Sequence, residues 1–211
     1  MKKLFLLILI LATSMDLSSK SMTELWQSIP DSIIPYIERS QRQEMTDFIA
    51  MGAEAKVRHA LQGQSKMDTI TSDYIHLTLN ESMQIELKRL PHESGDSILC
   101  LVKTWGGPCQ ESEVYFYSQD WQPLAIATPL ARYRENPLLS RPDTMSAEKF
   151  EELSHKVGFV LAAASLSPID NSLSVYQSVP LLSAEDNQKI KTMLTPVSLK
   201  WNGQCFKLTN T

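Results

Sequence analysis

Residues 74–90 read YIHLTLNESMQIELKRL, and this stretch decides the fold class. Apolar and polar side chains alternate along it, most clearly where polar residues separate Met83, Ile85 and Leu87. An alternation of period two is typical of a strand with one buried face. Only a short link at residues 80–81 interrupts the pattern, so we expect two strands that pair antiparallel.

Two more strands follow toward the C-terminus. Residues 97–105 form an apolar run that a Gly-Gly-Pro sequence at 106–108 ends, and residues 113–118 form the next run. Glycine and proline at these places are typical of turns between strands. Four consecutive strands with short links predict an antiparallel meander.

Helical patterns lie on both sides of this meander. Capping boxes begin at Ser21 and Ser40, and apolar residues at helical spacing continue to about residue 61. A short helix is also expected over 31–39, and Ser146 caps a longer pattern over about 147–164. We therefore expect an α+β protein whose antiparallel meander carries helices packed on one face.

The last segment predicts a hairpin of its own. Residues 197–201 and 204–208 flank Asn202-Gly203, the preferred pair for a type I′ turn. In that register Leu199 would face Phe206, and Val197 would face Leu208 on the same side.

The first residues predict export. Lys2 and Lys3 precede an unbroken apolar run at residues 4–12, which is about half the length that a spanning helix needs. A basic start, a short apolar run and a polar exit are typical of a secretory signal peptide, here about residues 1–19. We expect the mature chain to be exported, either periplasmic or secreted, with no membrane span.

The remaining residues, 20–211, are expected to form a single α+β domain. Hydrophobic residues make up 43% of the chain, which is ordinary for a globular protein. Residues 119–145 hold four prolines and little periodicity. They predict a connection that crosses the domain or, as the alternative, a boundary between two unequal lobes.

Charge and motifs exclude several function classes. The net charge is −4 and no basic run is present, so nucleic acid is not an expected partner. Glu151 and His155 have the spacing of two metal ligands on a helix, but no second histidine-rich segment accompanies them. We expect no catalytic constellation, no metal and no cofactor.

Three cysteines leave one thiol over if one disulfide forms. Cys100 and Cys109 flank a predicted hairpin tip and are the candidate pair. A turn centred on residues 106–107 would put them out of register, and a bulge at Pro108 would restore it, so the bridge stays open. Cys205 is then the leftover thiol.

Aromatic residues are the candidates for binding. They are Trp105, Tyr115, Tyr117 and Trp121. Exposed aromatic side chains often anchor partners. The alternative, which we favour, is that they fill the interface between sheet and helices.

The leading functional hypothesis is a non-enzymatic exported protein that binds an unknown protein, peptide or envelope component. It follows from the predicted export and from the missing catalytic pattern. The alternative is a hydrolase acting on envelope material, with a site assembled from distant residues such as Asp73, Glu86 or His155. A small-ligand carrier is a third hypothesis and would need an apolar cavity.

Five short segments carry a resemblance. They are IPDSIIP at 29–35, TSDY at 71–74, ELKRL at 86–90, GPC at 107–109 and FYSQDWQPL at 116–124. Their order resembles an exported family of unknown function from gut-dwelling Gram-negative bacteria, over most of the mature chain. The resemblance implies the compartment and implies no activity or catalytic residues. The order of helices and strands also resembles the architecture of β-lactamase inhibitory proteins, which is a fold-level analogy.

Overall fold

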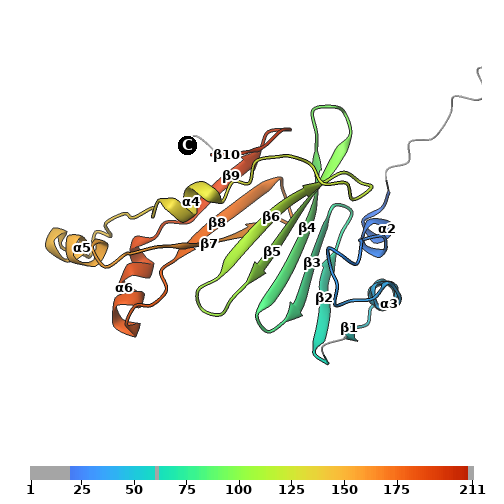
Figure 1. Ribbon diagram of the computed structural model, residues 1–211, viewed down its shortest axis with the longest axis horizontal. Helices are drawn as coiled ribbons and strands as arrows, with labels where there is room; N and C mark the ends of the chain where they lie inside the picture. Colours follow the sequence, from blue (N-terminus) through green and yellow to red (C-terminus); the bar gives the residue numbers. More distant parts are fainter. Residues whose placement is uncertain (1–19, 60–61, 209–211) are drawn as a thin grey trace, which may run out of the picture.

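The computed structural model describes residues 20–59 and 62–208, and the predicted leader at 1–19 lies outside them. The protein contains two antiparallel sheets, one with the order β1-β2-β3-β4-β5-β6 and one with the order β10-β9-β8-β7 (Figure 1). Together with the helices, they confirm the predicted α+β class and the antiparallel meander.

The first sheet is longer than the four predicted strands. Its strands are β1 (Ala55–Arg58), β2 (Gln64–Ile70), β3 (Tyr74–Asn80), β4 (Met83–Pro91), β5 (Ser97–Trp105) and β6 (Glu111–Tyr117). Ile75 lies opposite Leu87 and Leu77 lies opposite Ile85, as the alternation requires. Strands β1 and β2 were not predicted.

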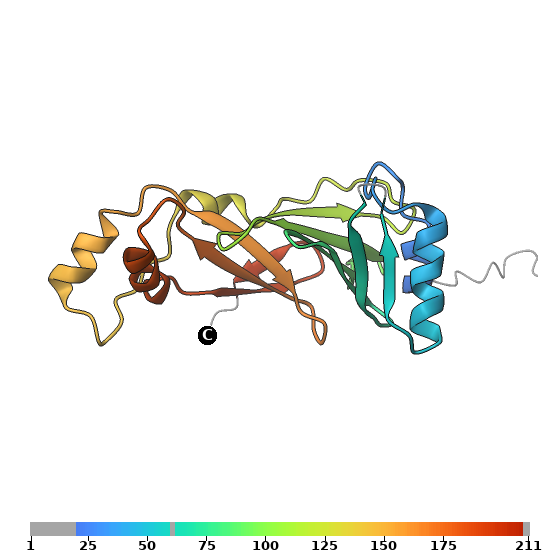
Figure 2. The same cartoon turned by 90° about the horizontal axis from the view of Figure 1, so that it is seen from below.

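Helices cover one face of this sheet, as predicted. They are α2 (Met22–Gln27) and α3 (Arg39–Ala50), which lie beside β1 and β2 at one end of the elongated molecule (Figure 2). Trp26 of α2 is buried and its indole N–H donates to the carbonyl of Arg42 at 3.0 Å. The first core consists of these helices, the chain between them, the apolar face of β1 to β5, and Trp121.

The prediction of a helix as far as residue 61 is wrong. Gly52 has a φ of +68°, and its N–H donates to the carbonyl of Ile49 at 3.0 Å. The N–H of Ala53 donates to the carbonyl of Phe48 at 2.8 Å, which completes a Schellman motif. This left-handed cap ends α3 at Ala50. The short helix expected over 31–39 is also wrong, because turns precede α3 there.

The second sheet follows a long connection. Its strands are β7 (Leu161–Leu166), β8 (Ser172–Ser178), β9 (Val197–Trp201) and β10 (Phe206–Leu208), and the helices near it are α4 (Ala131–Glu135), α5 (Ala147–Ser154) and α6 (Ala184–Met193). The helix expected over 147–164 is half the predicted length. Residues 161–166 form β7 instead, because cross-strand pairing with β8 overrides the helical propensity of three consecutive alanines.

The C-terminal hairpin forms in a different register. Trp201 lies opposite Phe206, and Leu199 lies opposite Leu208. The loop is therefore two residues longer than that of a type I′ turn. The Asn202 side chain stabilises it by accepting hydrogen bonds from the N–H groups of Gln204 and Cys205 at 3.0 and 2.9 Å. The shift is even, so the apolar side chains keep a common face.

The helix-free face of the first sheet packs on the second sheet. Cys100, Val102 and Phe116 contribute to this second core from the first sheet, and Leu173 and Trp201 contribute from the second. Residues 119–145 connect the two sheets and contain α4 (Figure 1). No helix in the described part of the chain is long and apolar enough to span a bilayer.

Candidate functional site

The edge strand β7 lies across the first sheet, and side chains of that sheet cap its backbone. The N–H of Ala164 donates to the Ser112 hydroxyl at 2.9 Å, and the N–H of Leu166 donates to the Glu86 carboxylate at 3.1 Å. An unpaired edge strand presents a row of free backbone groups that favours aggregation. Ser112 and Glu86 therefore replace a neighbouring strand.

Glu86 is the centre of this contact and is 7% exposed. Its carboxylate also accepts hydrogen bonds from the Tyr74 hydroxyl at 2.6 Å and the Ser165 hydroxyl at 3.1 Å. Burial raises the pKa of Glu86, although these hydrogen bonds oppose the shift. Burial and the adjacent Glu86 raise the pKa of Tyr74 as well.

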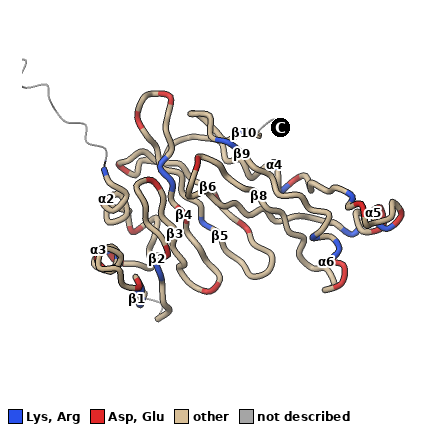
Figure 3. Tube along the Cα trace, turned by 180° about the vertical axis from the view of Figure 1, so that it is seen from behind, with Lys and Arg blue, Asp and Glu red and all other residues tan. Residues whose placement is uncertain are grey.

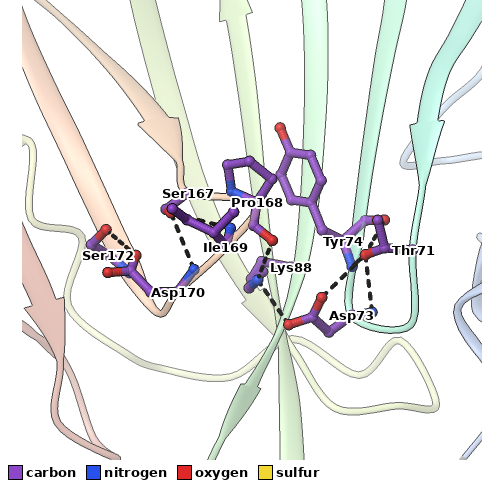
Figure 4. A network of polar contacts seen from close by, with 9 residues as sticks. All are labelled: Thr71, Asp73, Tyr74, Lys88, Ser167, Pro168, Ile169, Asp170 and Ser172. Atoms are coloured by element: carbon purple, nitrogen blue, oxygen red, sulfur yellow. Dashed lines mark hydrogen bonds and ion pairs between the residues drawn. The ribbon is translucent and has the colours of Figure 1, made fainter.

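A buried lysine extends the same contact. The Lys88 ammonium lies 2.8 Å from the Asp73 carboxylate and 3.4 Å from the carbonyl of Pro168, and Lys88 is 1% exposed. Figure 4 shows Lys88 between Asp73 and the β7–β8 turn. Thr71 holds Asp73 through a 3.1 Å hydrogen bond. We call the set of Asp73, Tyr74, Glu86, Lys88 and Ser112 with the β7 groups that they contact the inter-sheet joint.

The residues named for a hydrolase do not converge. Asp73 and Glu86 belong to the inter-sheet joint, whereas His155 is the C-cap of α5 at the far end of the molecule (Figure 1). A separate His76–Asp68 pair, at 3.1 Å, lies on β3 and β2. Within the described ranges, no group of His, Cys, Asp and Glu side chains is arranged to hold a metal ion.

The structure brings three of the four predicted aromatic residues together. The ring centroids of Tyr115 and Tyr117 are 6.4 Å apart, and those of Tyr117 and Trp121 are 5.6 Å apart. This row packs against the first core, and the Trp121 indole N–H donates to the Ser28 hydroxyl at 3.3 Å. Trp105 lies at the other end of β5, opposite Met83 on β4. The row thus covers the junction of sheet and helices.

The candidate disulfide is not formed, and all three cysteines, which lie in the described part of the chain, are free. Cys100 lies opposite Phe116 on β5, while Cys109 lies in the loop beyond Trp105. Five strand positions separate Cys100 from the end of β5, which is about 16 Å at the rise of a strand. A disulfide needs its two Cα atoms within about 7 Å.

A groove of about 570 Å³ lies between the β5–β6 loop, β8 and α6, and we call it the α6 groove. Its polar lining comprises Gln110, Tyr176, Gln177, Ser178, Asn187, Gln188 and Lys191. Tyr176 and Ser178 share one face of β8, and Asn187 and Lys191 are one helical turn apart on α6. Among the described residues that line the groove, there is no Asp, Glu, His or Cys.

Most polar groups of the α6 groove have no partner among the described residues. The Ser178 hydroxyl is buried without a hydrogen bond. The side chains of Tyr176, Asn187, Gln188 and Lys191 take part in no hydrogen bond or ion pair within the part of the chain described. Buried polar groups are normally satisfied, so the Ser178 hydroxyl needs a partner, and the exposed side chains of Tyr176, Gln188 and Lys191 around it are accessible to a ligand.

Gln177 is the exception in the groove lining. Its amide donates to the carbonyl of Asn136 at 2.8 Å and accepts from the N–H of Leu138 at 2.8 Å. It therefore holds the chain after α4 against β8.

A second hollow of about 940 Å³ lies between the β4–β5 turn and residues 118–126. Of its charged residues, Lys20 pairs with Asp120 at 2.6 Å, whereas Asp96 forms no ion pair within the described part of the chain. His92 shares a 2.9 Å hydrogen bond with Ser94. The α6 groove is the better candidate because, among the described residues, most of its polar side chains lack a protein partner and its Ser178 hydroxyl is buried without one.

The α6 groove was missed at the level of sequence. A strand over 172–179 and a helix that begins at Ser183 follow from the patterns, but Gln110 lies some seventy positions earlier. The four-residue spacing of Asn187 and Lys191 was the available signal, and it is common on solvated helices.

Comparisons with known proteins agree with the fold. A solved structure described as a domain of an uncharacterized protein from Porphyromonas gingivalis is similar to this chain, with 18% sequence identity and a TM-score of 0.65. The match covers 90% of this chain and 98% of that chain, and at this identity it shows the fold alone. A comparison with curated proteins finds no match.

A family model described as a protein of unknown function, DUF3256, matches residues 14–206. That range includes nearly every described helix and strand. The chain therefore belongs to the DUF3256 family.

Proposed function

We propose that the protein is an exported, non-enzymatic binding protein that holds a protein, peptide or envelope component in the α6 groove. The observation that carries this proposal is the set of unpartnered polar groups around a hollow of about 570 Å³. Ligand sites favour such hollows at the junction of two structural units, with a few polar groups that orient the ligand.

The chemistry of the groove favours binding over hydrolysis. General acid–base catalysis needs a titratable pair within hydrogen-bond reach of the substrate. Within the described part of the chain, no carboxylate, imidazole or thiol lines the groove. The buried carboxylate with a raised pKa, Glu86, is occupied by three donors in the inter-sheet joint.

Export rests on the first residues of the chain, and cell fractionation tests it. We expect the protein in the periplasmic or extracellular fraction, shortened by about nineteen residues as in a processed signal peptide. Full-length protein that stays in the cytoplasm would contradict export.

The binding role is tested with immobilised mature protein and a solubilised envelope fraction. We expect a component that the wild type retains and that a Tyr176→Ala, Asn187→Ala double variant does not retain. A Lys189→Gln variant is the matched control, since Lys189 lies on the same helix and pairs with Glu185. Equal retention by the wild type and the double variant, or no retained component at all, would overturn the proposal.

A further inference from the structure

We infer that the α6 groove takes the C-terminal end of an extended peptide, with the free carboxylate beside Lys191. This inference rests on the proposed function and names the ligand class of the same groove. The inference goes beyond the proposed function because the charge and the hydrogen-bonding groups around the groove select one kind of ligand.

The charge of Lys191 is unopposed, unlike that of its neighbours. Lys149 pairs with Glu152 at 2.7 Å, Lys156 pairs with Asp186 at 3.1 Å, and Lys189 pairs with Glu185. Figure 3 shows residues of both signs on α5 and α6. Lys191 forms no ion pair within the described part of the chain, and no carboxylate lines the groove beside it. The groove therefore favours an anionic group.

The uncharged walls match peptide units. Gln110 comes from the β5–β6 loop, and Asn187 and Gln188 come from α6. Each carboxamide offers an acceptor and two donors, which complement the N–H and C=O of a peptide bond. The unsatisfied Ser178 hydroxyl adds a group that needs a partner.

An apolar side chain near the carboxylate also has a place. Tyr176 is 47% exposed, and the apolar part of the lining includes Val179, Ile190 and Leu194. An aromatic ring provides a large contact area with little loss of side-chain entropy. We therefore expect the last residues of the peptide to be apolar.

The length of the groove fits a short segment. Helix α6 spans ten residues, or about 15 Å at the helical rise. An extended peptide advances about 3.3 Å per residue, so roughly four or five residues fit along it. A neutral glycan of this size would leave the charge of Lys191 without a counterpart.

The test measures fluorescence anisotropy on the mature chain. The probe is a pool of N-terminally fluorescein-labelled pentapeptides with apolar last residues and free carboxyl termini, and the comparison pool is identical but amidated. We expect the free pool to bind about tenfold more tightly or better, as a charge-assisted hydrogen bond implies. Lys191→Gln should lower its affinity to that of the amidated pool, and Lys189→Gln should leave it unchanged.

Two results would overturn the inference. One is equal binding of the free and amidated pools, and the other is equal loss in the Lys191→Gln and Lys189→Gln variants. Thermal melts of both variants exclude unfolding as a cause. If neither pool binds while the envelope fraction still yields a component that depends on Tyr176, the inference fails and the proposed function stands. If both experiments give nothing, both fail.

Discussion

Two polar regions of this protein differ in one respect, which is whether their polar groups have partners. In the inter-sheet joint, Glu86 accepts three hydrogen bonds and Lys88 has both a carboxylate and a carbonyl. In the α6 groove, the side chains of Ser178 and Lys191 have no such partner among residues 20–59 and 62–208. Satisfied polar groups join the two sheets, and we propose that the unpartnered ones bind a ligand.

The largest expected effect on stability comes from a substitution at Glu86. Glu86→Ala leaves the Leu166 N–H and the hydroxyls of Tyr74 and Ser165 without their acceptor in a buried place. We expect a loss of about 3 kcal/mol in the free energy of unfolding, measured by urea denaturation. Glu81→Ala, in the exposed β3–β4 turn, is the control and should change it by less than about 0.5 kcal/mol. A loss at Glu86 as small as that of the control would show that the joint does not hold the sheets.

Removing either partner of the Lys88–Asp73 ion pair should lower the stability by a different amount. Asp73→Ala leaves the Lys88 ammonium without its counterion, and Lys88 is 1% exposed. We therefore expect the free energy of unfolding to fall by about 2 kcal/mol. Lys88→Met keeps the side-chain length and leaves only Asp73 unpaired, and water reaches that carboxylate. The free energy of unfolding should therefore fall by less than about 1 kcal/mol. Equal losses in thermal or urea unfolding would contradict this difference in burial.

Measuring the stability at several pH values tests the effect of Glu86 protonation. Its folded pKa lies above its usual value of 4.5, so the folded state binds the proton more tightly than the unfolded state. The stability from this group is present below about pH 4.5 and is lost as the pH rises through the folded pKa, by at most about 1.4 kcal/mol per pH unit. Glu86→Gln lacks this titration, so the stability of the wild type relative to this variant should fall as the pH increases. A difference that is flat or rises from pH 4 to pH 7 would contradict the raised pKa.

The smallest expected effect is in the α6 groove. Ser178→Ala removes a buried hydroxyl that has no partner, so the free energy of unfolding should stay the same or rise by up to about 1 kcal/mol. Asn187→Ala and Gln188→Ala should change it by less than about 0.5 kcal/mol. Differential scanning calorimetry measures all of them. A clear destabilisation by any of these variants would mean that the groove is structural.

Strands with a strong alternation were predictable, and weakly patterned ones were not. The pattern of residues 74–90 predicted β3 and β4 nearly to the residue. Strand β2 fully buries only Ser65 and Met67, and a register shift between Met67 and Thr69 interrupts its alternation, so its pattern is weak. Strand β1 has four residues and follows α3 so closely that its apolar residues continued the helical pattern. The left-handed cap at Gly52 ends α3 before β1 begins.

The sequence by itself determined the local chemistry of this protein: the alternation of the central meander, the serine caps of α2, α5 and α6, and the family of the chain. These features depend on neighbours along the chain, so they can be read from it. Only the tertiary structure decided that residues 161–166 form an edge strand, that Glu86 caps it and that Gln110 and Lys191 line one groove. These arrangements bring together residues some eighty positions apart in the sequence. Their energies depend on burial, and burial cannot be read from spacing along the chain.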